Sequence, residues 1–140
     1  MRTAEEVVIV VTRPGPEFLV LLRSPDKHGY WNPIAGGIEE GETPEEAARR
    51  ELVEESGLED PLAFERLPLE VGYRRPPESG GFWVPLHVFR TEAPAGWEPV
   101  LNDEHVEFRW LPAADAVALL AFPEPRDAVR YVAELFEVRT

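Results

Sequence analysis

The chain has 140 residues, of which 44% are hydrophobic and 10% aromatic; this length and composition exclude a disordered chain and predict one globular domain over residues 1–140. The sequence contains no cysteine, which excludes disulfides, thiolate catalysis and Cys-ligated metal centres. Fourteen basic and 27 acidic side chains give a formal net charge of −13, which argues against binding to long nucleic acids and requires a bridging divalent cation if a phosphate compound is to bind.

The N-terminal segment predicts a β-hairpin. Val7 to Val11 is a continuous run of apolar, β-branched residues, as expected for a strand that is covered on both faces. Pro14-Gly15-Pro16 predicts a turn, and Phe18 to Leu22 predicts the second strand of the hairpin. Residues 24–35 contain two prolines and a glycine, and we expect them to form a loop.

A helix is predicted over residues 44–56. Thr43 and Glu46 have the spacing of a capping box, and Pro44 occupies the first helical position, where its missing N–H costs no hydrogen bond. Gly57 supplies a residue that readily adopts the left-handed conformation after the last turn. Both ends of this helix are therefore marked in the sequence.

The second half of the chain predicts more strands and two helices. Phe64 to Val71 and Phe82 to Phe89 are expected strands, and Pro85 places the second one at an edge or a bulge. Apolar and charged residues alternate from Val106 to Trp110, the period of a half-buried strand. The two helices are expected over Ala113 to Leu120 and Pro125 to Phe136. This order predicts the α/β class, with a mixed sheet and helices on its faces.

Three acidic residues share one face of the predicted helix, next to its apolar side. Glu51, Glu54 and Glu55 fall within an arc of roughly 100°, in the C-terminal half of the helix, where the helix dipole disfavours anions. A solvated acidic face is one explanation. The other is a site for a hard cation such as magnesium, manganese or calcium, which carboxylate oxygens bind well. The glycine-rich segment over residues 36–42 favours the second, because a glycine turn lets the backbone approach an ion or a phosphate closely.

The segment from Gly36 to Leu58 resembles the Nudix box. It consists of Gly36, five residues, Glu42, seven residues, Arg50-Glu51-Leu52, one residue, Glu54-Glu55, one residue and Gly57-Leu58. The resemblance implies an α/β/α sandwich in which the box forms a loop, a helix and a loop. It also implies an enzyme that uses Mg²⁺ or Mn²⁺ to hydrolyse nucleoside diphosphates linked to another moiety.

The resemblance also implies roles for individual residues. Glu54 and Glu55 are the expected principal metal ligands, with Glu51 as a further ligand or the general base, and Ala35 is expected to offer its backbone carbonyl to the metal. Arg50 is expected to bridge the glutamates of the box, especially Glu42, with a phosphate contact as the alternative. Glu104 resembles an acid that other family members carry on a later loop, where it serves as metal ligand or base; an ordinary loop charge is the alternative.

The residues that would bind the rest of the substrate are less clearly marked. Tyr30 and Tyr73 could stack on a base, although aromatic residues near strands often belong to the core. Arg23 and Arg74 could contact phosphate or ribose, with surface charges as the alternative.

Several substrates are compatible with the sequence. The segment around Glu104-His105 and Phe108 to Leu111 resembles MutT-like and dihydroneopterin triphosphate branches of the family, which favours a (deoxy)nucleoside triphosphate or a dihydroneopterin triphosphate-like substrate. The position of Tyr73 makes diadenosine polyphosphates the runner-up, and ADP-ribose stays open. A nucleotide-sensing module without catalysis is the alternative outside the enzymes.

Three further expectations concern the protein as a whole. No apolar run approaches the roughly 20 residues that cross a bilayer, and acids stand near the start, where a signal peptide carries basic residues. We therefore expect a cytoplasmic protein with no membrane partner. The scarcity of Asn, Gln, Met and Cys is typical of thermophile proteins, and the resemblance makes a homodimer possible.

Overall fold

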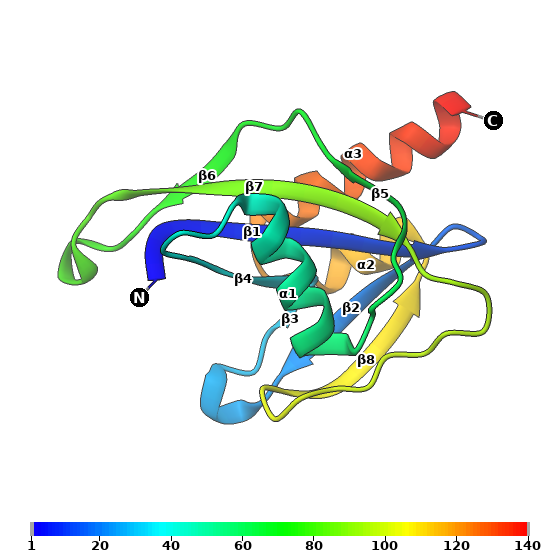
Figure 1. Ribbon diagram of the computed structural model, residues 1–140, viewed down its shortest axis with the longest axis horizontal. Helices are drawn as coiled ribbons and strands as arrows, with labels where there is room; N and C mark the ends of the chain where they lie inside the picture. The colour runs from blue at the N-terminus through cyan, green and yellow to red at the C-terminus, as the bar shows by residue number, and fades with distance from the viewer. Residues whose placement is uncertain (1, 140) are drawn as a thin grey trace.

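A mixed sheet of eight strands forms the centre of the fold (Figure 1), and the computed structural model describes residues 2–139 of the chain. The strand β1 (Arg2–Arg13) runs parallel to β7 (Trp83–Glu92) along one edge. Its other edge pairs with β4 (Ile34–Glu39) and, at its end, with β2 (Glu17–Arg23), both antiparallel. The predicted hairpin is therefore confirmed, with Thr12 opposite Phe18.

Shorter strands extend the sheet on both sides. On one side β2 pairs with β3 (Trp31–Asn32) and with β8 (His105–Leu111). On the other side β7 pairs with β5 (Leu62–Arg66) and with β6 (Val71–Arg74). Two 3-10 helices, η1 (Pro25–Lys27) and η2 (Pro77–Ser79), lie in the connections.

Helices cover both faces of the sheet, so the predicted α/β/α sandwich is confirmed. The helix α1 (Pro44–Ser56) lies in front of the sheet in Figure 1, and α2 (Ala113–Leu119) and α3 (Pro123–Arg139) lie behind it. The apolar residues of β1 divide between two main cores and a smaller cluster. Val7, Ile9 and Val11 pack with α1, Val10 packs with α2 and α3, and Val8 packs with Val84 and Leu86 of β7. Because both faces of the strand are covered, it is apolar at every position from Val7 to Val11.

The helix α1 begins and ends where the sequence predicts. The Thr43 hydroxyl accepts from the Glu46 N–H at 3.1 Å, and the Glu46 carboxylate accepts from the Thr43 N–H at 2.8 Å, which completes the capping box. Gly57 has φ +76° and its N–H donates to the Val53 carbonyl at 2.9 Å. The helix is therefore fixed in register relative to the segments on either side of it.

Two expectations for residues 24–42 are wrong. Residues 31–32 and 34–39 are strands rather than loop or turn, and Gly36 and Gly37 pair with Val7 and Glu6 of β1. The local sequence hides these strands because Pro33 and the glycines have low strand propensity. They form because the edges of β1 and β2 supply hydrogen-bond partners from elsewhere in the chain.

Two more expectations are corrected in the second half of the sheet. The single strand expected from Phe64 to Val71 is interrupted at residues 67–70, which include Pro68, so that β5 and β6 are separate. The strand β7 is internal rather than an edge. Pro85 is accommodated because it pairs with Gly72 of β6, while pairing with β1 begins at the next residue. Within residues 2–139, no helix is long and apolar enough to cross a membrane.

Candidate active site

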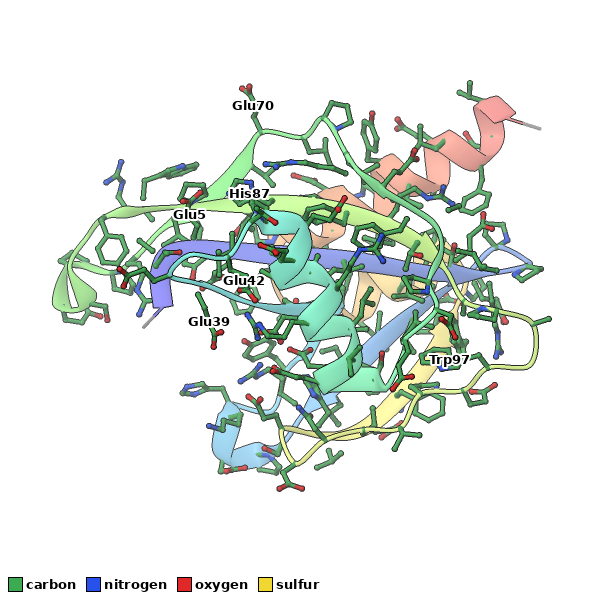
Figure 2. The ribbon with its side chains drawn as sticks, viewed as in Figure 1. Glu5, Glu39, Glu42, Glu70, His87 and Trp97 are labelled. Atoms are coloured by element: carbon green, nitrogen blue, oxygen red, sulfur yellow. The ribbon has the colours of Figure 1, made fainter. Side chains whose placement is uncertain are left out.

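A single arginine binds the carboxylates around α1. The Nε and Nη2 atoms of Arg50 donate to the two carboxylate oxygens of Glu42 at 2.7 and 2.9 Å, and Nη2 also donates to the Gly37 carbonyl at 2.9 Å. Its Nη1 donates to Glu51 at 2.8 Å and to Glu54 at 3.2 Å. The Arg50 hydrogen bonds lower the pKa of Glu42, and the Glu42 carboxylate raises that of Arg50. Figure 2 shows Glu42 beside α1.

Two of the box glutamates are buried. The exposed fractions of Glu51 and Glu55 are 3% and 4%, and they lie on the same side of α1 as Ala47, Ala48 and Leu52. Charged residues are seldom buried to this extent unless they are paired or bind a cation. Arg50 neutralises Glu51 but makes no recorded contact with Glu55 among the residues that the structure describes.

Gly36 makes room for the Glu51 carboxylate. A Cβ atom at position 36 would lie 2.3 Å from both the Cδ and the Oε1 atoms of Glu51, far inside van der Waals contact. Gly36 belongs to β4, and its φ is not in the left-handed region. Glycine is therefore required at position 36 to leave space for the Glu51 carboxylate.

Glu55 lies between β4 and β8. Its Oε1 accepts from the Ala35 N–H at 3.4 Å and lies 3.8 Å from Nε2 of His105. Burial and the neighbouring Glu51 carboxylate raise the pKa of Glu55 to about 10. His105 donates from Nδ1 to Asn102 Oδ1 at 3.1 Å, and burial lowers the pKa of His105. Burial therefore favours the neutral form of the imidazole, whose Nε2 faces Glu55.

Glu54 and Glu104 are the exposed carboxylates of this region. The exposed fractions of their side chains are 53% and 47%. Glu104 helps to raise the pKa of Glu55 by charge repulsion, and its Oε2 lies 3.7 Å from Nη2 of Arg23. Its loop is held near η1, because its carbonyl accepts from the Ser24 N–H at 2.8 Å.

The chemistry of these groups suits a hard dication. Glu51, Glu54, Glu55, Glu104 and the Ala35 carbonyl are all oxygen donors. Among the described residues, however, no three acidic or histidine side chains are already arranged around a common point. Arg50 holds Glu51 and Glu54 through hydrogen bonds, so a cation that binds here has to share these carboxylates with the guanidinium.

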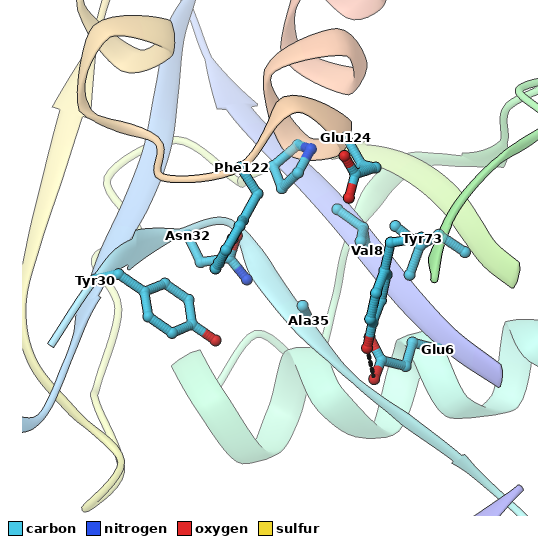
Figure 3. A pocket seen from close by; sticks show the side chains of 10 residues that line it. Glu6, Val8, Tyr30, Asn32, Ala35, Tyr73, Phe122 and Glu124 are labelled. Atoms are coloured by element: carbon cyan, nitrogen blue, oxygen red, sulfur yellow. Dashed lines mark hydrogen bonds between the residues drawn. The ribbon is translucent and has the colours of Figure 1, made fainter. Parts of the chain in front are cut away.

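A pocket of about 290 Å³ adjoins the carboxylates. Ala35 lines the pocket and also donates to Glu55, so it lies between the two features. Tyr30 and Tyr73 line the pocket as well (Figure 3). Arg23 lies beside it, with its guanidinium carbon 5.5 Å from the centre of the Tyr30 ring. Arg74 does not line it; its Nη1 donates to the Gly81 carbonyl at 2.8 Å.

Sequence reasoning missed several residues of this region. Asn32, Phe122 and Glu124 line the pocket, and His105 contacts Glu55. None of them belongs to a spacing pattern within its own segment. They meet through tertiary contacts, since β3 and β8 both pair with β2 and the start of α3 lines the same pocket as Asn32. The one sequence pattern near these residues is the half-buried strand pattern of β8, and this pattern does not predict that His105 is buried.

Comparisons with known proteins identify the family of this chain. Residues 2–133 match the NUDIX domain family. An octanoyltransferase from Myxococcus xanthus is 36% identical over 134 residues; the match covers 93% of this chain but spans about a third, 36%, of that protein. A dihydroneopterin triphosphate diphosphatase from Haemophilus influenzae is 27% identical over 138 residues, covering 90% of this chain and 85% of the relative.

A solved structure shows the same fold. The Escherichia coli dihydroneopterin triphosphate pyrophosphohydrolase superimposes with a TM-score of 0.80 at 24% identity, over 93% of this chain and 94% of that one. The fold and the box together define a Nudix domain, and the chain belongs to the Nudix family.

The contact between Gly36 and Glu51 can be tested with a double-mutant cycle. We expect Gly36→Ala to lower the free energy of unfolding in the wild-type background, because the new methyl group displaces the Glu51 carboxylate from Arg50. In a Glu51→Ala background, Gly36→Ala should lower the free energy of unfolding by less. The coupling free energy between the two substitutions should be about 1 kcal/mol. Urea denaturation of the four proteins measures this. Equal costs in the two backgrounds would show that the methyl group is accommodated without moving Glu51.

The pKa of Glu55 predicts how stability depends on pH in metal-free protein. The folded protein keeps this proton up to about pH 10, whereas the unfolded chain releases it near the ordinary value of 4.5. The folded state therefore binds more protons between these values, so its free energy of unfolding should fall as the pH rises. Urea denaturation in chelator between about pH 6 and pH 9 should show a shallower fall for Glu55→Gln. Parallel slopes for the two proteins would place the Glu55 pKa in its usual range.

Proposed function

We propose that this protein hydrolyses a diphosphate linkage in a nucleoside polyphosphate, in a reaction that depends on Mg²⁺ or Mn²⁺. The observation that carries the proposal is the buried pair Glu51 and Glu55, which Arg50 neutralises in part and which lies beside a pocket large enough for a flat heterocycle. Burial of two neighbouring carboxylates is costly unless a cation compensates them. A hard dication is therefore expected at this position.

In this proposal, individual residues of the chain have separate roles. Glu51, Glu54, Glu55 and the Ala35 carbonyl would hold the metal, with Glu104 joining them from its loop. A bound dication lowers the pKa of water and neutralises the charge of the phosphates. Arg50 fixes the box carboxylates through Glu42 and Glu51. Glu51 and Glu104 are the two candidates for the group that takes the proton from the attacking water.

The net charge of the protein supports a role for divalent cations in substrate binding. At a net charge of −13, the chain repels a polyphosphate unless cations bridge the two. Arg23 is the one cationic side chain that we place near the substrate, between Tyr30 and Glu104. Arg74 donates to the Gly81 carbonyl in the β6–β7 connection and does not line the pocket. A contact between Arg74 and the substrate stays a prediction.

A (deoxy)nucleoside triphosphate or a dihydroneopterin triphosphate-like compound is our proposed substrate. The support is the resemblance around Glu104-His105 and the name of the relative that matches over most of its length. Diadenosine polyphosphates and ADP-ribose are the alternatives, and a panel of all these compounds tests them. If none of these compounds is hydrolysed but a nucleotide still binds, the result would favour the nucleotide-sensing module. A cytoplasmic location, a thermophilic source and a homodimer stay predictions.

Glu54 offers a direct test of the metal-dependent reaction. We expect Glu54→Gln to lower kcat by orders of magnitude at saturating Mg²⁺, because an amide binds a hard dication less well than a carboxylate. Glu54 is exposed, so the fold should survive the change. Glu45→Gln removes a charge from the first turn of the same helix, at an exposed position, and should leave kcat near the wild-type value. A near-wild-type rate for Glu54→Gln would remove this residue from the site.

A further inference from the structure

The loop that joins β7 to β8 carries Glu104 at its end. Both backbone polar groups of Glu104 are hydrogen-bonded. Its N–H donates to Asn102 Oδ1 at 3.2 Å, and its carbonyl accepts from the Ser24 N–H at 2.8 Å. The backbone of Glu104 is therefore fixed on both sides, whereas its side chain is about half exposed and can still rotate toward a cation.

The side chain of Asn102 makes a second contact through the same atom. Its Oδ1 also accepts from Nδ1 of His105 at 3.1 Å. A backbone N–H can only donate, so the atom of Asn102 that the Glu104 N–H contacts is the oxygen and not the nitrogen. Nδ1 of His105 must then be the donor in its contact, which fixes the edge of the ring that faces Asn102. One oxygen therefore holds both a backbone and a ring.

The opposite edge of the His105 ring faces Glu55. Nε2 of His105 lies 3.8 Å from Oε1 of Glu55, and both side chains are buried. The same Oε1 accepts from the Ala35 N–H at 3.4 Å. Because side chains in a packed interior have few alternative positions, the orientation of the ring limits where the Glu55 carboxyl group can lie.

We propose that Asn102 is a positioning residue of the candidate active site, which places Glu104 directly and Glu55 through His105 for a divalent cation. Hydrogen bonds behind metal-binding side chains orient those side chains, and their loss commonly lowers metal affinity by about 10- to 100-fold. The inference rests on the proposed function for the assignment of Glu55 and Glu104 as metal ligands.

The rest of the loop is anchored independently of the Asn102 side chain. The Val100 N–H donates to the Ser56 carbonyl at the end of α1 at 2.9 Å, and Leu101 packs against the core that contains Leu52. We therefore expect the loop to keep its course when Asn102 is changed. The change should be confined to the placement of Glu104 and His105.

Asn102 also has a purely structural explanation. An asparagine side chain that accepts from the N–H two residues later stabilises a turn, and the Asn102 carbonyl accepts from the His105 N–H at 3.3 Å. Asn102→Ala could therefore lower stability without any effect on the metal site. Metal affinity separates the two explanations, because a weaker turn alone does not change the dissociation constant of molecules that are folded.

The test measures Mn²⁺ binding to the full chain without substrate, from the electron paramagnetic resonance signal of free Mn²⁺. We expect Asn102→Ala to raise the dissociation constant about tenfold or more. Asn102→Asp keeps an acceptor oxygen at the same place and should bind Mn²⁺ within about threefold of the wild type, or more tightly. Asp103→Ala changes the exposed neighbour in the same loop and should stay within about threefold as well.

Thermal unfolding in chelator shows which variants are folded at the temperature of the binding measurement. Asn102→Gln keeps the amide but displaces its oxygen by one methylene group, so it should also weaken Mn²⁺ binding by about tenfold. This variant takes the place of Asn102→Ala if the alanine variant is unfolded.

A double-mutant cycle tests the route through Glu104. In a Glu104→Gln background, Asn102→Ala should raise the Mn²⁺ dissociation constant by a smaller factor than in the wild type, because the carboxylate that Asn102 places is gone. An equal factor in the two backgrounds would show that Asn102 does not act through Glu104 and would overturn the inference.

The outcomes distinguish this inference from the proposed function. If the wild type does not bind Mn²⁺, the proposed function is overturned and the inference with it. If the wild type binds Mn²⁺ and the folded Asn102→Ala variant binds it equally well, the inference alone is overturned, whatever the change in unfolding temperature. An equal loss of affinity in Asn102→Asp would show that the acceptor oxygen is not what matters and would overturn the inference too.

Discussion

The guanidinium of Arg50 holds the candidate active site of this protein together. It contacts Glu42 before the helix, Glu51 and Glu54 on the helix, and the Gly37 carbonyl of β4. Without this cation, the neighbouring carboxylates would repel one another, and burying these polar groups would cost free energy. One planar cation with five donors can satisfy all four groups at once, which an ammonium group could not do with the same geometry.

Glu55 is the buried carboxyl group of this region that Arg50 does not neutralise. It is buried beside Glu51, with which it shares a hydrogen bond, and the Ala35 N–H and the His105 ring also face it. The same burial that raises its pKa would strengthen its attraction to a dication, because water does not screen the charge there. In metal-free protein Glu55 keeps its proton at neutral pH, so a dication that binds this carboxylate would have to displace that proton.

The sequence predicted those parts of the molecule that depend on local chemistry. The ends of α1 follow from the Thr43 capping box and Gly57, and the acidic face of α1 follows from helical periodicity. The strands β3 and β4 could not be predicted in the same way, since Gly36 and Pro33 are poor strand residues and their pairing partners lie in β1 and β2. Glycine at position 36 looked like a turn, whereas its role is to leave space for Glu51. His105 and Glu124 enter the region only through tertiary contacts, so no pattern within β8 or α3 marks them.

The segment from Tyr30 to Ala35 connects the two halves of the proposed site. Within six residues it contributes an aromatic wall, the unpaired acceptor of Asn32 and the backbone N–H that contacts Glu55. Its short strands are anchored on β2 and β1, so the distance between the pocket and the carboxylates is fixed by the sheet rather than by a loop.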